Sequence, residues 1–238
     1  MKSPEIFGII GAMDSEVKQL TDRMTEKETV EYCGRIFYSG ILGGQRAVVA
    51  RSGIGKVCAA GCAQILIDRF RITKLINIGI AGGVGEGLHV GDLVIGIALC
   101  QHDFDICLFG HGKGNFGTDP RDQPTLFRAD PEMAEAMKRT AAERIGRESV
   151  REGIIASGDQ FICDGDVKRK IRKDFNASAV EMEGGAIAQI ASMANIPFLV
   201  LRAISDLADG SATESFEVFE VETANLCATV LEDFLRSF

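Results

Sequence analysis

The segment from Ala179 to Asp209, AVEMEGGAIAQIASMANIPFLVLRAISDLAD, shows most about how this chain folds. It contains a run from Phe198 to Arg202 that is apolar except at its last residue, which is typical of a strand buried on both faces of a sheet. The residues from Gly184 to Asn195 are mostly small or apolar, and this favours a helix packed against that sheet. A helix followed by a buried strand predicts an α/β fold.

Polar residues occur where the predicted strand ends. Ligands of open α/β sheets bind beyond the carboxyl ends of the strands, so Ser205 and Asp206 lie where a substrate is expected. Asp206 has a second interpretation, because an aspartate there can cap the next segment as an Asx turn. Upstream, Glu181 and Glu183 flank Met182. The helix dipole accounts for one of these acids, whereas a pair of carboxylates can accept hydrogen bonds from both hydroxyls of a ribose.

Strands and helices alternate along the rest of the chain, with a hairpin near the start that turns at Gly43 and Gly44. This order predicts a single-domain, three-layer α/β/α structure with a mixed central sheet. The predicted strands are 6–12, 32–42, 46–52, 75–80, 92–99, 153–156 and 198–202. The predicted helices are 55–70, 131–147, 167–175, 184–195 and 216–238, with one more after an N-cap at Asp14 or Ser15.

The composition fits one domain over residues 1–238. The chain of 238 residues can bury one large core, and its five prolines mark no linker. The residues from Met1 to Glu5 lead into a strand without a basic leader, and no apolar run reaches membrane-spanning length. Seven cysteines without a Cys-x-x-Cys pair indicate reduced thiols. We therefore expect a cytoplasmic protein with no membrane partner.

Charge and motifs exclude several other classes of function. The net charge of −8 argues against a nucleic-acid partner. The Gly-x-Gly-x-x-Gly string at 112–117 precedes a segment that cannot open a helix, and Lys56 lacks the flanking residues of a phosphate-binding loop. The segment from His102 to Asp105 offers too few ligands for a metal, and no Gly-x-Ser-x-Gly elbow occurs. We expect no cofactor and no metal.

Several motifs together resemble those of the 5'-methylthioadenosine/S-adenosylhomocysteine nucleosidases, which belong to the nucleoside phosphorylase family. Besides the 179–209 segment they are GIIGAMDSEV at 8–17, SGIGK at 52–56, NIGIAGG at 77–83 and SGDQFI at 157–162. They occur in family order over almost the whole chain. The resemblance implies a nucleoside phosphorylase-like fold and hydrolysis of the N-glycosidic bond of the two nucleosides, with release of adenine and a thio-substituted ribose.

The same resemblance implies roles for single residues. Cleavage passes through a ribosyl cation, so the enzyme must protonate the departing purine and activate water. Asp206, assisted by Ser205, matches the acid, and Glu16 matches the base, although by composition alone Glu16 reads as a solvated helix residue. The matching binding residues are Glu183, Met182 and Glu181 for the ribose, Phe161 and Ile162 for the adenine, and Ile54, Ile106, Phe109 and Phe216 for the alkylthio group.

Ile80 separates this chain from the phosphorylases of the family. Those enzymes carry a phosphate contact in the stretch that matches Asn77 to Ile80, and an apolar residue there favours water as the acceptor. Ile80 also replaces the Ser or Thr that is frequent there in the nucleosidases. A purine nucleoside phosphorylase, a futalosine or aminodeoxyfutalosine hydrolase and a nucleoside-binding protein without chemistry remain as alternatives, and 5'-deoxyadenosine remains as a further substrate. The resemblance also implies a homodimer in which the neighbour closes the pocket.

Overall fold

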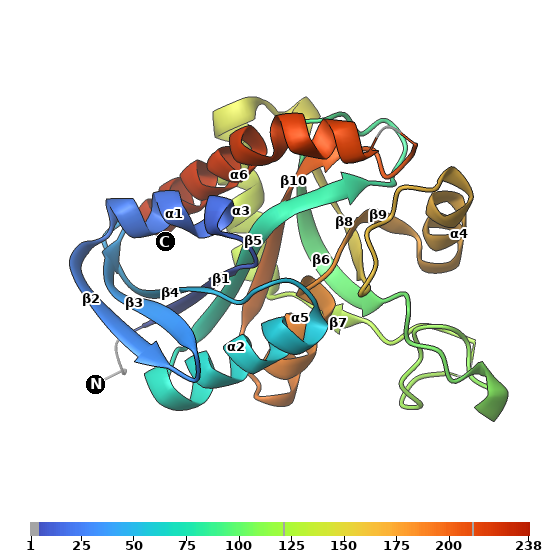
Figure 1. Cartoon of the computed structure of the whole chain (residues 1–238), viewed down its shortest axis with the longest axis horizontal. Helices are drawn as coiled ribbons and strands as arrows, with labels where there is room; N and C mark the ends of the chain where they lie inside the picture. Colours follow the sequence, from blue (N-terminus) through green and yellow to red (C-terminus); the bar gives the residue numbers. More distant parts are fainter. Residues whose placement is uncertain (1–4, 121, 211) are drawn as a thin grey trace.

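The computed structural model describes residues 5–120, 122–210 and 212–238, and the opening residues 1–4 lie outside them. Within these ranges ten strands form one mixed sheet (Figure 1). The strands are β1 Phe7–Gly11, β2 Thr25–Tyr32, β3 Arg35–Leu42, β4 Gln45–Arg51, β5 Lys74–Gly83, β6 Leu93–Gln101, β7 Phe127–Arg128, β8 Val150–Ser157, β9 Ala177–Glu181 and β10 Phe198–Asp206.

One part of the sheet closes on itself. The strand order is β10-β6-β8-β9-β5-β1-β4-β3-β2, and β10 also pairs with β5. β10 runs parallel to β5 from Phe198 opposite Leu75 to Asp206 opposite Gly82, and antiparallel to β6. The strands β5, β9, β8, β6 and β10 therefore form a ring, and β1, β4, β3 and β2 extend from β5 as an open sheet. This closure brings the ends of β5, β9 and β10 together.

Helices cover both faces of the sheet (Figure 1). Helices α1, α3 and α6 pack together on one face, and α2 packs with α5 on the other. The bounds are α1 Asp14–Arg23, α2 Lys56–Phe70, α3 Pro131–Ile145, α4 Gly165–Phe175, α5 Gly184–Met193 and α6 Ala212–Ser237, with short 3-10 helices η1 Cys107–Phe109 and η2 Arg147–Ser149. The predicted α/β fold with a mixed sheet is confirmed. No helix in the described part of the chain is long and apolar enough to cross a membrane.

The hydrophobic core explains why polar residues at strand ends matter in this chain. Every residue of β1 and of β10 is buried. β10 continues to Asp206 and does not end at Arg202 as predicted, so Arg202, Ser205 and Asp206 all lie inside the molecule. Burying such groups is costly unless they are paired or hydrogen-bonded. Their partners therefore indicate where the fold supports a functional site.

Two further predictions about local structure are wrong. The strand predicted at 32–42 is interrupted by a turn at Cys33 and Gly34, both with positive φ, and β2 precedes it. Sequence patterning missed β2 because this strand is mostly exposed and charged, without apolar alternation. The N-cap of α1 is Met13, not Asp14 or Ser15. Its backbone N–H is satisfied by the side chain of Glu16.

Candidate active site

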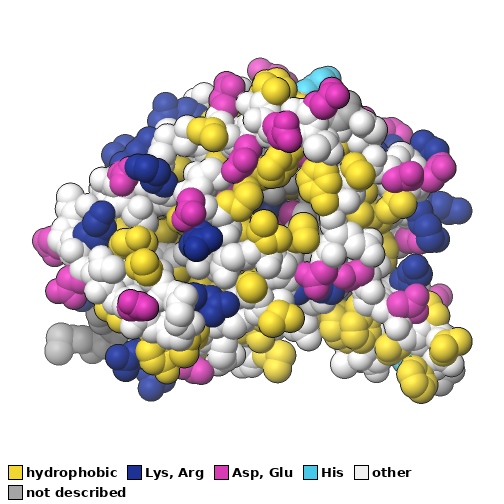
Figure 2. All heavy atoms as spheres, in the orientation of Figure 1, with side chains coloured by type: hydrophobic (Ala, Val, Ile, Leu, Met, Phe, Trp, Pro, Cys, Tyr) yellow, Lys and Arg dark blue, Asp and Glu magenta, His cyan; other side chains and the backbone are white. Residues whose placement is uncertain are grey.

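A cavity lies where β5, β9 and β10 end, and Figure 2 shows a hollow bordered by hydrophobic side chains. It holds about 640 Å³ of empty space, a volume that includes its open mouth. Most of the predicted site residues line it, although they come from distant parts of the chain. They are Glu16, Ile54, Ile80, Phe161, Ile162, Glu181, Met182, Glu183, Ser205, Asp206 and Phe216.

Glu16 lies in the first turn of α1, but its side chain turns inward and is only 3% exposed. Its Oε2 accepts hydrogen bonds from the backbone N–H of Ala12 at 2.5 Å and of Met13 at 3.0 Å. Its Oε1 accepts one from the N–H of Ile80 at 3.1 Å. Burial raises the pKa of Glu16 against the opposing effect of Arg202 and these amides. Glu16 is thus a fixed, buried carboxyl group, and the solvated interpretation is wrong.

Asp206 is the last residue of β10 and is 2% exposed. Its Oδ1 accepts a hydrogen bond from the N–H of Ala208 at 2.8 Å, which is the geometry of the Asx-turn interpretation. Its Oδ2 accepts one from the hydroxyl of Ser205 at 2.9 Å. Burial raises the pKa of Asp206, although the Ala208 amide and the Ser205 hydroxyl lower it. Asp206 therefore shapes the turn and also faces the cavity with an elevated pKa.

Glu16 and Asp206 reach the cavity from different elements but meet β5 at nearby positions. Glu16 accepts its hydrogen bond from Ile80, and Asp206 is the register partner of Gly82, the second residue after Ile80. Two residues of a strand span roughly 7 Å. The side chains of Glu16 and Asp206 are thus held beside the same end of β5, and both line the cavity.

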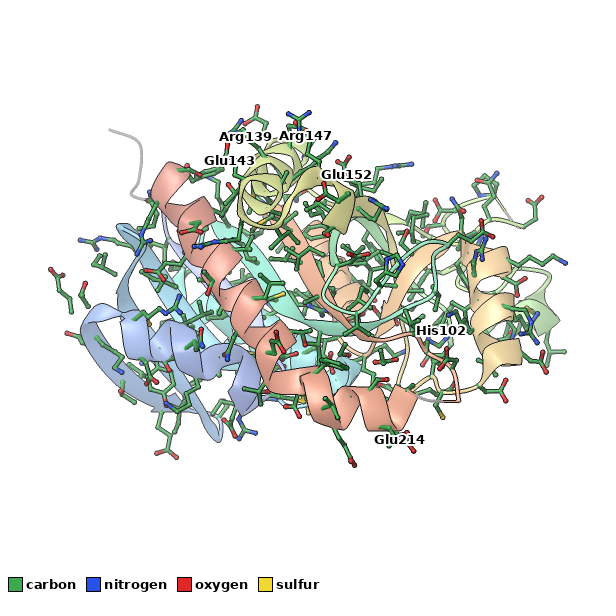
Figure 3. The ribbon with its side chains drawn as sticks, turned by 90° about the horizontal axis from the view of Figure 1, so that it is seen from above. His102, Arg139, Glu143, Arg147, Glu152 and Glu214 are labelled. Carbon is green, nitrogen blue, oxygen red and sulfur yellow. The ribbon has the colours of Figure 1, made fainter. Side chains whose placement is uncertain are left out.

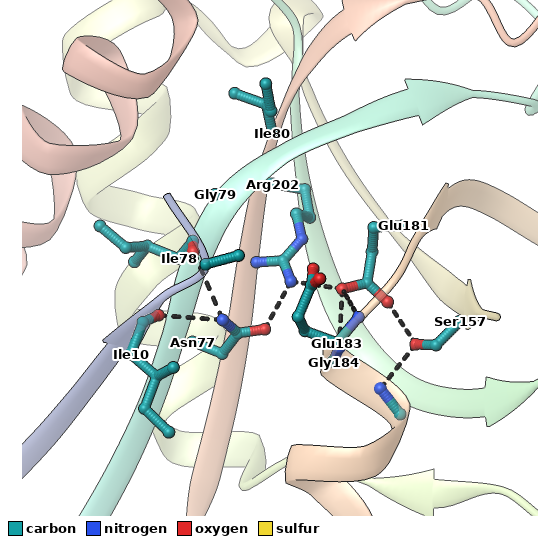
Figure 4. A network of polar contacts seen from close by, with 12 residues as sticks. Ile10, Asn77, Ile78, Gly79, Ile80, Ser157, Glu181, Glu183, Gly184 and Arg202 are labelled. Carbon is teal, nitrogen blue, oxygen red and sulfur yellow. Dashed lines mark hydrogen bonds and ion pairs between the residues drawn. The ribbon is translucent and has the colours of Figure 1, made fainter. Parts of the chain in front are cut away.

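A buried ion pair beside the cavity joins β9 to β10 (Figure 4). Arg202 and Glu181 form it, with side chains 1% and 2% exposed, and Arg202 also donates to Oδ1 of Asn77 at 2.5 Å. The hydroxyl of Ser157 donates to the other oxygen of Glu181. Sequence analysis missed Arg202, Asn77 and Ser157. The one signal was an arginine within an otherwise apolar strand, because a buried guanidinium requires a buried carboxylate.

The two acids of the Glu-Met-Glu motif have different surroundings. Glu181 has both oxygens engaged, since Oε2 also accepts from the N–H of Glu183 at 3.0 Å and of Gly184 at 2.7 Å. Burial would raise the pKa of Glu181, but Arg202 and the hydrogen bonds outweigh it and lower this pKa. In Glu183 only Oε1 has a partner among the described residues, the N–H of Gly55 at 2.8 Å. Burial and the charge of Glu181 raise the pKa of Glu183 to about 7. Glu183 is therefore the acid with an oxygen available to a ligand.

Aromatic and aliphatic side chains form the outer part of the cavity. The rings of Phe161 and Phe216 lie 5.7 Å apart between centroids and are perpendicular. Phe161 is 47% exposed and Ile54 is 58% exposed, so both offer apolar surface to a ligand. A flat base and an apolar substituent gain by burial against such surfaces.

Two predicted pocket residues, Ile106 and Phe109, do not line this cavity. They belong to the loop after β6, where Leu108 is 101% exposed and Phe109 is 78% exposed. They therefore do not form a wall of the cavity within their own chain. Among the residues that the structure describes, no group of three or more His, Cys, Asp or Glu side chains is placed to hold a metal ion.

The arrangement supports acid–base chemistry on a small ligand. The carboxyl groups of Glu16 and Asp206 both have a raised pKa. A third carboxylate, Glu183, offers a hydrogen-bond acceptor between apolar walls. Groups of this kind donate and accept protons near neutral pH.

Comparison with known proteins shows the family of this chain. The chain belongs to the phosphorylase superfamily, whose family model matches residues 6–236. Similar proteins include several 5'-methylthioadenosine/S-adenosylhomocysteine nucleosidases. The one from Aeromonas salmonicida is 41% identical over 213 residues, which cover 89% of this chain and 90% of that protein. The family resemblance inferred from the motifs is confirmed.

Two solved structures show the same fold. A 5'-methylthioadenosine/S-adenosylhomocysteine nucleosidase from Neisseria meningitidis, in complex with methylthio-immucillin-A, is 38% identical with a TM-score of 0.92 and covers 98% of this chain and 100% of that one. The futalosine hydrolase of Helicobacter pylori is 31% identical with a TM-score of 0.91 and covers 98% of each chain. A mixed-sheet nucleoside phosphorylase-like fold is therefore shown for this chain.

Proposed function

We propose that this chain hydrolyses the N-glycosidic bond of 5'-methylthioadenosine and S-adenosylhomocysteine, with release of adenine and the thio-substituted ribose. The observation that carries the proposal is the pair of buried carboxyl groups, Glu16 of α1 and Asp206 of β10, that line one cavity beside the end of β5. The name of the 41% identical relative supports the substrate class, as does the methylthio-immucillin-A complex of the 38% identical structure.

The departing base receives its proton from Asp206. With the hydroxyl of Ser205 beside it, Asp206 donates a proton to N7 of adenine while the bond between N9 and C1' breaks. Adenine leaves as a neutral molecule, and positive charge develops on C1' and the ring oxygen of the ribose. Burial supports this role because it favours the protonated carboxyl group that an acid needs.

Water is activated by Glu16. As the water oxygen bonds to C1', one water proton passes to the Glu16 carboxylate, and both carboxyl groups later exchange protons with solvent. Glu183 accepts hydrogen bonds from the ribose hydroxyls through the oxygen that Gly55 leaves open. Glu181 supports this geometry as the counterion of Arg202, since both of its oxygens are occupied.

The base and the sulfur substituent occupy the apolar part of the cavity. Phe161 stacks on the purine, and the backbone of Phe161 and Ile162 recognises its edges. Phe216 and Ile54 contact the alkylthio group, which has no hydrogen-bond demand and gains by burial.

Product analysis in phosphate buffer tests hydrolysis against phosphorolysis. Because Ile80 presents an apolar side chain to the cavity, we expect free methylthioribose as the main sugar product even at high phosphate concentration. Chromatography of the products with a sugar 1-phosphate standard measures this. The sugar 1-phosphate as main product would contradict hydrolysis.

A second measurement tests the futalosine hydrolase alternative, which the 31% identical Helicobacter pylori structure supports. Relative kcat/KM for methylthioadenosine and aminodeoxyfutalosine separates the two functions.

We further propose a homodimer in which the exposed loop after β6 covers the cavity of the other copy. Leu108 is fully exposed and Phe109 is mostly exposed, and large apolar side chains in this state mark an association surface. Phe109 of the partner subunit then walls the sulfur end of the pocket, as the family resemblance implies.

Light scattering is expected to give twice the mass of one chain. Phe109→Ser is expected to raise KM for methylthioadenosine about tenfold, because a wall contact contributes binding energy. A monomer with full activity would rule the homodimer out.

We also propose a single domain and a cytoplasmic location. The continuous sheet supports one domain over residues 1–238. All seven cysteines are free thiols, including the exposed Cys33, Cys107 and Cys163, which supports a reducing, cytoplasmic location.

A further inference from the structure

Two loops carry the outermost residues of the cavity. The loop before α2 carries Ile54, and the loop after β8 carries Gln160 and Phe161. Ile54 is 58% exposed and Phe161 is 47% exposed, so core packing does not hold either side chain. The positions of these residues must depend on other contacts of their loops.

A ring of polar contacts joins these two loops to the segment after β6. The Lys56 ammonium lies 2.5 Å from Oδ1 of Asp103, and the backbone N–H of Asp159 donates to Oδ2 of Asp103 at 2.9 Å. The backbone N–H of Lys56 donates to Oδ1 of Asp159 at 2.8 Å. Each of the three residues therefore contacts the other two, and we refer to them as the Lys56–Asp103–Asp159 ring.

Within the ring, the ion pair of Lys56 and Asp103 is better shielded from water than an ordinary surface ion pair, whereas Asp159 is exposed. The side chains of Lys56 and Asp103 are 17% and 18% exposed, compared with 73% and 57% for the pair Lys18 and Asp22. Shielding strengthens an ion pair whose other hydrogen bonds are also satisfied. Burial tends to raise the pKa of Asp103, but the Lys56 ammonium and the Asp159 amide outweigh it and lower this pKa. Asp103 is therefore ionised at neutral pH.

A buried histidine supports the second loop from the inside. His102, labelled in Figure 3, is 7% exposed and packs edge-on against Phe175 of α4, with 6.5 Å between ring centroids. A Cβ at Gly158 would lie 2.5 Å from Cε1 of His102, so only glycine fits there without a shift. Burial lowers the pKa of His102, so we expect its side chain to be neutral and to support the loop by packing alone. The ionic part of the support comes from the ring.

The ring is also connected to Glu183, the carboxylate that we propose binds the ribose. The N–H of Gly55 precedes Lys56 and donates to Oε1 of Glu183 at 2.8 Å. Gly55 has a φ of +94°, which favours glycine, and Oδ1 of Asp159 lies 3.1 Å from the place of a Cβ. A displacement of Lys56 therefore moves the amide that orients Glu183.

We propose that the Lys56–Asp103–Asp159 ring positions the nucleoside by setting the spacing between Phe161 and the Glu183 carboxylate. None of its three members lines the cavity, so they act through Gly55 and Phe161. The inference rests on the proposed function, because it needs a ligand whose base and ribose are held by different loops. The hydrogen bonds of Asp206 come from Ser205 of β10 and from Ala208 just after it. Those of Glu16 come from Ile80 of β5 and from Ala12 and Met13 just before α1.

Breaking the ring is expected to weaken binding more than chemistry. In Lys56→Met and in Asp103→Asn, KM for methylthioadenosine is expected to rise about tenfold, because the two loops no longer hold base and ribose at one spacing. The expected fall in kcat is less than about threefold, since the acid and the base keep their hydrogen bonds. Steady-state release of adenine measures both constants.

Three further variants serve as controls. Lys138→Met removes an ammonium that also lies 2.5 Å from a carboxylate, that of Glu152, but outside the cavity, and it is expected to keep the wild-type KM. Lys56→Arg retains the charge and is expected to keep KM within about threefold. The double variant Lys56→Met/Asp103→Asn is expected to be no worse than the poorer single variant, because either change breaks the same ring.

Melting temperatures establish that each variant is folded. If Lys56→Met does not fold, the proposal is tested with Asp103→Asn, and Lys56→Arg remains its control. A KM within about twofold of the wild type in the folded single variants overturns the proposal. A lower melting temperature with reduced kcat and unchanged KM shows a structural role alone and also overturns it. Absence of adenine release by the wild type refutes the enzymatic proposal, and calorimetric binding of methylthioadenosine to wild type and variants then decides the role of the ring.

Discussion

Asp206→Asn is expected to lower kcat for methylthioadenosine by about 10³-fold, the scale of a lost general acid, while the fold and substrate binding are retained. An asparagine can keep the hydrogen bond from the N–H of Ala208 through its oxygen, and its amide can donate to the Ser205 hydroxyl in place of accepting from it. The shape of the site is thus preserved. What the variant loses is a proton that can be transferred to the purine.

The rate is measured by adenine release, and binding by calorimetry with the intact nucleoside. Because the acid must be protonated, wild-type kcat/KM is expected to fall as pH rises through the raised pKa of Asp206. This alkaline decline is expected to be absent from the residual activity of Asp206→Asn. A variant that keeps most of its turnover would remove Asp206 from the acid role.

Glu16→Gln is expected to lower kcat by about 10²–10⁴-fold, because an amide cannot take a proton from water. The carboxylate accepts hydrogen bonds from the N–H groups of Ala12, Met13 and Ile80. In the variant the amide nitrogen faces at least one of these donors, so a lower melting temperature is also expected. Kinetics together with thermal unfolding separate the two effects.

Gly79→Ala provides a second test of Glu16 that leaves the carboxylate in the chain. A Cβ at position 79 would lie 3.0 Å from Cδ of Glu16, so the added methyl must displace the base. Kcat is expected to fall by about tenfold or more, since a small misplacement of a catalytic group is costly. For the wild type, kcat/KM is expected to fall as pH drops through the raised pKa of Glu16. Substantial activity in both variants would end the assignment of Glu16 as the base.

Local patterning predicted most of the helices and buried strands correctly. The strand that begins at Phe198 and the helix that begins at Gly184 follow from apolar runs and small residues. Motif resemblance indicated many of the residues that line the cavity, but also Ile106 and Phe109, which do not line it. Patterning failed at β2, where the strand is exposed and charged, and at the end of β10, where Arg202 resembles the end of a strand. At β2 the charged residues are exposed, as their types suggest, but no apolar alternation marks the strand; at Arg202 a charged residue is buried inside the strand.

The amino-acid sequence was sufficient for the fold class, for the family and for most cavity residues, because these depend on patterns and motifs within short segments. Folding settled which carboxylates have counterions and which remain available. Glu181 and Glu183 look equivalent in the chain, yet β10 places Arg202 against the first, and a glycine 128 residues away donates to the second. Glu16 likewise depends on an amide 64 residues away on β5. Such partners follow from strand order and sheet closure, which no local pattern encodes.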